Sequence, residues 1–439
     1  MTTRRALLGL LGVAAGVGAV PAATSCRREP DRDEAGRAPG PEPVPGDVLV
    51  VELAGGALAV VDAAHGRMLV GPAPGVLTGD GGRLVRTERP AEAITRLTSH
   101  RLPDGTLVSG GTLAGRLAVR ATSPDGALVA LATDAGPGHS PYRPGPRERT
   151  TIVVADSAGE RRRLELPGNL EPEAFASGGQ ALFVLDYLPP TRPDRYRVRV
   201  VDLASGELQP LLTRTKSAVP PGAEEEMRGE GRQAVHDRRR NRLFTLYTHQ
   251  PDHVHTRDRI AGARRDAPHV HAFVHTLSLD ERWAFCVDLP APFGERAAGG
   301  HAIVSDPDGT ALYVVDVGTG SLARIDPDGL VVTGTLRFEP PAGSAGGPPV
   351  ASAAFAEPAV LLVGAGREVV GVAASAGGET VRRWSTPADV RGLAGPADGT
   401  RLYVGQPDAV LRVDPADGTV RQRIDVPGLV GLRRVVTGD

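Results

Sequence analysis

Residues 300–338 carry the pattern that most restricts how this chain can fold. Apolar and polar residues alternate there in four short runs, at 302–304, 311–315, 322–325 and 331–336. Turn-forming residues separate the runs, namely Gly309, Gly320 and Gly329. The pattern predicts four antiparallel strands joined by tight turns. One sheet of this length cannot bury both of its faces, so it must pack against copies of itself.

The same plan recurs from residue 47 to the end of the chain, and the 56 glycines and 39 prolines supply its many turns. Residue 47 opens on what would be the second strand of a unit, whereas the tail 429–439 matches a first strand. Joining the two ends completes a unit, which is how a ring of sheets avoids an unpaired edge. The predicted fold is therefore an all-β β-propeller of four-stranded blades over 47–439. The count is eight blades, or seven if the irregular unit near residues 78–110 forms no sheet.

Two units also carry a family resemblance. PDGTALYVVDVGTGSLARID at 307–326 and PADGTRLYVGQPDAVLRVDPADGTV at 396–420 resemble the YVTN family of bacterial β-propeller repeats. The other units match its skeleton loosely. The resemblance implies a propeller shape and no particular activity, because members of this family do many different things.

The amino terminus resembles an export signal. Arg4 and Arg5 precede an apolar, glycine-rich run at 6–20. Fifteen helical residues span about 22 Å, too short for a bilayer core of ~30 Å, so this run is predicted to be a signal-peptide core. The paired arginines resemble a twin-arginine signal.

The next segment resembles a bacterial lipobox and predicts a lipid anchor. Ala23-Thr24-Ser25-Cys26 resembles the motif in which the cysteine is diacylated and becomes the new amino terminus, so residues 1–26 are a signal peptide with a lipobox. A cleaved signal beside an incidental cysteine is the alternative. Residues 27–46 are rich in Pro, Gly and charge, which predicts a disordered tether. We expect an exported protein anchored to the outer face of the cytoplasmic membrane.

The net charge, one acidic run and one cysteine allow three further predictions. The formal net charge is −2, so no basic field favours nucleic acid. The run Glu224-Glu225-Glu226 lies in a polar loop and is predicted to be solvated. Cys286 alternates with apolar residues on an expected strand, which favours a buried, inert thiol over a metal ligand.

Six of the chain's 11 histidines lie between residues 249 and 275. A strand at 268–277 would put His269, His271 and His275 on one face, with His269 and His271 about 6.6 Å apart. His269 and His271, together with His253 or His255 from the preceding loop, would bind a divalent ion such as zinc, copper or iron. Water would take the fourth position. The alternatives are a polar pocket lined by hydrogen-bonded histidines, and no role. The residues that such a pocket would add are His236, His249, His275 and His301.

These features predict a function class rather than a reaction. The favoured function is a ligand- or protein-binding module that uses the rim loops and central channel. The alternative is a metal-dependent hydrolase or oxidoreductase with the histidines at its centre. No catalytic residue, substrate or partner protein is specified by the sequence.

Overall fold

The computed structural model describes residues 46–437 except 135, 137, 138, 229–232, 263–271, 344–349, 375, 376, 397 and 398. The chain divides into two units, Met1–Val44 and Pro45–Asp439, and the described residues all belong to the second. They form 31 strands, three short 3-10 helices and one short α-helix. None of the helices in this described part is long and apolar enough to span a membrane. The sequence prediction of an all-β fold is confirmed.

One sheet has seven strands in the order β31-β1-β2-β3-β4-β5-β6. Its strands are β1 (Val48–Leu53), β2 (Ala57–Asp62), β3 (Met68–Leu77), β4 (Arg83–Ala91), β5 (Ile94–Arg101), β6 (Leu107–Ala114) and β31 (Leu429–Val436). β3 is shared: Met68, Val70, Ala73 and Pro74 pair with β2, and Gly75–Leu77 pairs with β4. β31 pairs with β1 from Val48↔Val436 to Leu53↔Leu429, so the two ends of the described chain lie in neighbouring strands.

Six further sheets have four strands each. The first three contain β7 (Leu117–Thr122), β8 (Val129–Thr133), β9 (Arg149–Asp156), β10 (Gly159–Pro167); β11 (Asn169–Phe175), β12 (Ala181–Leu188), β13 (Arg195–Asp202), β14 (Leu208–Pro210); β15 (Gln233–Asp237), β16 (Arg242–Tyr247), β17 (Phe273–Ser278), β18 (Ala284–Asp288). The last three contain β19 (His301–Ser305), β20 (Leu312–Asp316), β21 (Ser321–Asp326), β22 (Val331–Arg337); β23 (Ser352–Glu357), β24 (Val360–Ala365), β25 (Glu368–Ala373), β26 (Thr380–Ser385); β27 (Leu393–Ala394), β28 (Leu402–Gln406), β29 (Ala409–Val413), β30 (Val420–Asp425). The helices are η1 (Ala54–Gly56), η2 (Ser177–Gly179), η3 (Ala298–Gly300) and α1 (Thr256–Ile260).

The four strands expected at 302–336 are confirmed as β19 to β22. Each strand pairs antiparallel with the next in the chain. Gly309 and Gly320 have φ of +66° and +65°, the left-handed conformation that their tight turns require of glycine. A Cβ at Gly320 would lie 2.4 Å from the Phe338 carbonyl oxygen, so the close approach of two backbones also needs glycine there.

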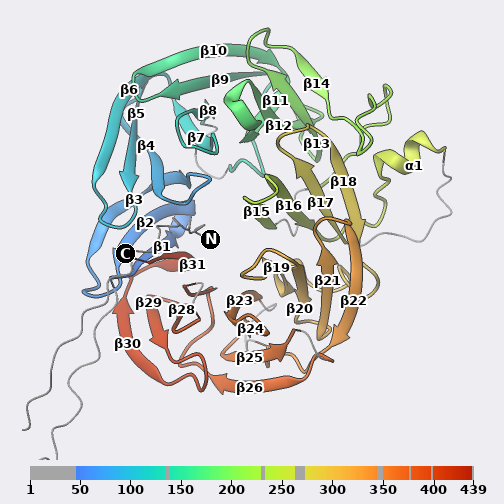
Figure 1. The fold of residues 1–439 in the computed structure, drawn as a ribbon. Helices are drawn as coiled ribbons and strands as arrows, with labels where there is room; N and C mark the ends of the chain where they lie inside the picture. Colours follow the sequence, from blue (N-terminus) through green and yellow to red (C-terminus); the bar gives the residue numbers. More distant parts are fainter. Residues whose placement is uncertain are drawn as a thin grey trace, which may run out of the picture. The chain divides into compact units, whose positions relative to one another are not determined.

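Most of the core lies between neighbouring sheets. Figure 1 shows the sheets of the second unit arranged side by side around a common centre. First strands of neighbouring sheets contact each other, as β19 does with β15 and β23. Most hydrophobic clusters draw side chains from two adjacent sheets; Tyr196 and Tyr247, for example, join the β11–β14 sheet to the β15–β18 sheet. One cluster, which includes Val50 and Leu84, lies within the seven-stranded sheet. Burial of both faces by neighbours is what the repeat pattern required.

Candidate metal centre

Three separate segments of the chain meet around the Glu225 carboxylate. Glu225 lies on the loop that follows β14, and His253 and His255 lie between β16 and α1. Cys286 lies on β18, the last strand of its sheet. One potential ligand atom from each of these four side chains lies within 4.8 Å of the others. We call this group the metal centre.

The packing between two sheets holds the metal centre in place. The Tyr196 and Tyr247 hydroxyls hydrogen-bond at 2.7 Å across the interface. Phe273 at the start of β17 stacks on the His253 ring, with 4.3 Å between ring centroids. Cys286 faces its cross-strand partner His275 on β17. The side chains of the metal centre are therefore held by close-packed aromatic neighbours.

The donor atoms have separations close to those of ligands around one ion. His253 Nε2 and His255 Nδ1 are 3.0 Å apart, and they lie 3.7 and 3.5 Å from Glu225 Oε2. Cys286 Sγ is 3.3 Å from the other carboxylate oxygen, Oε1. A tetrahedral zinc ion with bonds of about 2.0–2.3 Å separates its ligand atoms by about 3.3–3.7 Å. Small side-chain shifts would complete such a shell.

Neighbouring acceptors orient both imidazoles toward the centre. His253 Nδ1 lies 3.0 Å from the Glu226 carbonyl oxygen, and His255 Nε2 lies 2.5 Å from Asp288 Oδ1. A ring nitrogen that faces an oxygen acceptor carries the proton, so the other nitrogen of a neutral ring presents its lone pair. In the neutral rings, His253 Nε2 and His255 Nδ1 therefore point lone pairs at each other. This arrangement needs a proton or a cation between them.

The charges at the centre favour a bound cation. Burial alone would raise the pKa of Glu225, but hydrogen bonds from His253 and His255 and the charge of His275 hold that pKa well below its usual value. Burial would lower the pKa of His255, yet Asp288 and Glu225 raise it to about 9. Burial and the Glu225 charge raise the pKa of the Cys286 thiol. Without an ion, protons occupy His255 and Cys286, and an incoming metal ion must displace them.

The prediction that residues 224–226 form a solvated excursion is wrong for Glu225. Its side chain is only 11% exposed, because the loop folds back against the β15–β18 sheet. Glu224 pairs with Arg197 and Arg199, and Glu226 pairs with Arg195. Ion pairs on both sides therefore fix the loop and turn the middle glutamate inward.

The structure brings some of the predicted histidines together and separates others. His253 and His255 meet at the centre, and His275 Nε2 lies 3.4 Å from Glu225 Oε1. His249 instead packs edge-on against His301, with ring centroids 6.5 Å apart. His236 contacts the Asn241 side chain at 3.2 Å. Arg4, Arg5, Cys26, His269 and His271 lie outside the described residues.

Sequence reasoning missed Glu225 as a candidate ligand and Asp288 as the partner of His255, and it favoured an inert thiol over a metal ligand for Cys286. A carboxylate in a polar loop gives no sign of burial, and Glu225 lies 61 residues from Cys286. The one available signal was that Cys286 falls on the strand that follows the histidine-rich segment.

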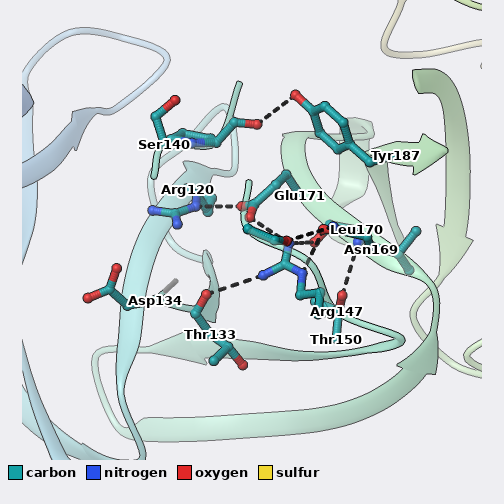
Figure 2. Close-up of polar contacts among 12 residues, drawn as sticks. Arg120, Thr133, Asp134, Ser140, Arg147, Thr150, Asn169, Leu170, Glu171 and Tyr187 are labelled. Carbon is teal, nitrogen blue, oxygen red and sulfur yellow. Dashed lines mark hydrogen bonds and ion pairs between the residues drawn. The ribbon is translucent and has the colours of Figure 1, made fainter. Parts of the chain in front are cut away.

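A second buried glutamate, Glu171 on β11, has a different environment (Figure 2). Its side chain is 1% exposed and accepts from Arg120 Nε at 2.7 Å and from Arg147 Nη2 at 2.5 Å. Arg147 also donates to Asn169 Oδ1 and to the Leu170 carbonyl. These fixed donors satisfy the carboxylate and join the β7–β10 sheet to the β11–β14 sheet.

Comparison with known proteins supports the fold. No protein-family model matches this chain, and no curated protein matches it significantly. Two structures of AztD from Citrobacter koseri, one of them the apo form, are similar with a TM-score of 0.52 each. They are 12% and 13% identical and cover 90% of this chain and 98% of theirs. BamB from Moraxella catarrhalis has a TM-score of 0.41 at 14% identity, covering 79% of this chain and 86% of its own. The structural neighbours are β-propellers, and this chain has a propeller fold.

Proposed function

We propose that this chain is a metal-binding β-propeller that holds one divalent transition-metal ion at the metal centre. The convergence of four donor atoms from Glu225, His253, His255 and Cys286 carries this proposal. Two imidazoles, one thiolate and one carboxylate are a donor set that suits zinc, in tetrahedral geometry.

The number of protein ligands favours binding over catalysis. Catalytic zinc sites keep a position for water or substrate, whereas sites with four protein ligands are closed. The centre offers four ligands and is largely buried, and His255 is 3% exposed. A binding module therefore fits these residues better than a metal-dependent hydrolase or oxidoreductase.

Metal content tests the proposal. Wild-type protein dialysed against zinc should retain one ion per chain, and Cys286→Ser and His255→Gln should each weaken binding by at least about 100-fold. His65→Gln is a matched control, because His65 is an exposed histidine paired with Asp62 far from the centre. Fewer than about a tenth of an ion per wild-type chain after separate incubation with zinc, copper and iron would contradict the proposal.

We also propose that the propeller has eight blades and closes through its two ends. Dividing the seven-stranded sheet within β3 gives two four-stranded blades, β31-β1-β2-β3 and the end of β3 with β4–β6. Antiparallel pairing of β31 with β1 supports closure. Deleting residues 429–439 should then lower the melting temperature markedly, because β1 would become an unpaired edge. An unchanged melting curve would contradict this closure.

Export and anchoring complete the proposal. Arg4 and Arg5 support twin-arginine export, and Cys26 supports acylation and attachment to the outer face of the cytoplasmic membrane. The membrane would then be one partner through the lipid, alongside a small-molecule or protein partner and without nucleic acid. Cys26→Ala should move the folded protein from the membrane fraction to the soluble fraction. Unchanged membrane association of this variant would place the anchor elsewhere.

A further inference from the structure

The short helix α1 lies against the metal centre. It begins directly after His255, which is one of the four proposed ligands. Figure 1 shows α1 at the outer edge of the β15–β18 sheet, beyond β18, and β18 is the strand that carries Cys286. Two of the four ligands therefore lie on segments that meet at this outer edge.

The start of α1 is bound to the centre through two polar contacts. His255 Nε2 lies 2.5 Å from Asp288 Oδ1, which orients the imidazole. The backbone N–H of Thr256, the first residue of α1, donates to Glu225 Oε2 at 3.2 Å. The position of α1 therefore decides whether His255 can reach the other ligands.

Arg257 is the residue that joins α1 to β18. Its Nη1 donates to the Cys286 carbonyl oxygen at 2.9 Å, and its Nη2 donates to Asp288 Oδ2. The guanidinium also lies over the Phe285 ring, 5.4 Å from the ring centroid. The other oxygen of Asp288 faces His255. One guanidinium therefore holds both the strand that carries a ligand and the carboxylate that orients another ligand.

The contacts of Arg257 lie at the surface, whereas those of the second histidine ligand lie in the interior. The side chains of Arg257 and Asp288 are 40% and 39% exposed, so water competes for the contact between them. The His253 side chain is 1% exposed and stacks on Phe273. The connection of α1 to β18 is therefore the weakest part of the wall around the metal centre.

We propose that Arg257 is a latch that controls how fast a metal ion enters and leaves the metal centre. This inference rests on the proposed metal binding. When Arg257 releases β18, the start of α1 moves outward, withdraws His255 and opens the centre to water. Because Arg257 contacts no ligand atom, its contacts form with or without a bound ion. Their loss should speed uptake and release alike and leave the equilibrium affinity almost unchanged.

The rate of zinc release tests this proposal on the full chain. Zinc-loaded protein is mixed rapidly with excess chelator, and the equilibrium affinity is measured separately by competition titration. Arg257→Gln should release zinc about 10-fold faster than wild type, while its affinity changes by less than about 3-fold. Arg259→Gln is the matched control, because it removes the same charge from the same helix, and Arg259 Nε donates to the Val254 carbonyl oxygen rather than to β18.

Three results would overturn the latch while leaving the proposed metal binding intact. The first is a release rate of Arg257→Gln equal to that of wild type. The second is an equal acceleration in Arg257→Gln and Arg259→Gln, which would assign the effect to charge alone. The third is a loss of affinity as large as the gain in release rate, which would show that Arg257 does not act on uptake. Wild-type protein that retains no zinc would instead overturn the metal binding and the latch together.

Discussion

Glu171 and Glu225 are both buried carboxylates at the interface between two sheets, yet their neighbours differ in kind. Glu171 accepts from Arg120 and Arg147, and Arg147 is itself held by Asn169 and the Leu170 carbonyl. Glu225 is surrounded by histidines and a thiol, groups that can lose their protons to a metal ion and bind it. Arginine stays protonated in proteins, so the Glu171 cluster is permanently charged and satisfied. The Glu225 cluster can change its charge, which makes it suitable for taking up and releasing a cation.

The comparison teaches that burial of a carboxylate does not identify its role. A carboxylate paired with fixed donors holds two sheets together. A carboxylate among groups that present lone pairs requires a proton or a metal ion to balance it. The identity of the neighbouring side chains, rather than the depth of burial, separates the two cases.

The largest expected difference is in stability. Glu171→Gln leaves two largely buried guanidinium groups without their counter-charge and should cost about 3–5 kcal/mol of unfolding free energy. Glu225→Gln should cost about 1–2 kcal/mol in metal-free protein, because His255 can lose its proton. Urea unfolding of both variants in the presence of a chelator measures the two losses. Equal losses would remove the distinction between the clusters.

The second prediction concerns zinc affinity as a function of pH. Because His255 and Cys286 hold protons in the metal-free protein, zinc must displace both. The affinity should rise by about 100-fold per pH unit between about pH 6 and 8. Competition titrations at three pH values measure this slope, and Cys286→Ser should reduce it to about 10-fold per unit. A slope unaffected by this substitution would show that the thiol is not a ligand.

The third prediction concerns the metal-free protein alone. Its His255 pKa is raised from 6.5 to about 9, so protonated His255 stabilises the fold fully below about pH 6.5. This contribution, on the order of 3 kcal/mol, should be lost as the pH rises through about 9. Denaturant unfolding with a chelator across this range measures the loss, and His255→Gln should show a flatter profile. Stability that rises over the same window would contradict the assigned pairing with Asp288 and Glu225.

The smallest expected effect is that of replacing Asp288 on zinc affinity. Asp288 orients His255 but is not one of the four ligands. Asp288→Asn should lower zinc affinity by about 10–100-fold while keeping one ion per chain, as is usual for groups that hydrogen-bond a ligating histidine. The same substitution should lower the pKa of His255 and weaken the pH dependence of stability. Asp258→Asn on α1 is a control, because the Asp258 carboxylate pairs with Arg257, and the substitution keeps the backbone hydrogen bond from Asp258 to the His255 carbonyl oxygen. Equal effects of the two substitutions would contradict a positioning role for Asp288.

The sequence by itself determined the local architecture of this protein. Alternation of apolar residues with period two and glycine at the turns are properties of neighbouring residues, so strands such as β19 to β22 could be located within a residue or two. The match between residues 429–439 and a first strand likewise indicated the partner of β1, and the two strands pair in the structure. The histidine-rich segment brought His253 and His255 into consideration, and their ring nitrogens lie 3.0 Å apart in the structure.

Only the tertiary structure decided which groups surround those histidines. Glu225 comes from another sheet's loop and Cys286 from a later strand, and no periodicity relates positions 61 residues apart. The loop turns inward because Glu224 and Glu226 find arginines on the β11–β14 sheet, a pairing that depends on how two sheets pack. The contacts of Arg257 with β18 have the same origin, because they join segments 29 residues apart in the chain. Strands follow from local pattern, whereas sites at the interfaces between sheets follow from packing across them.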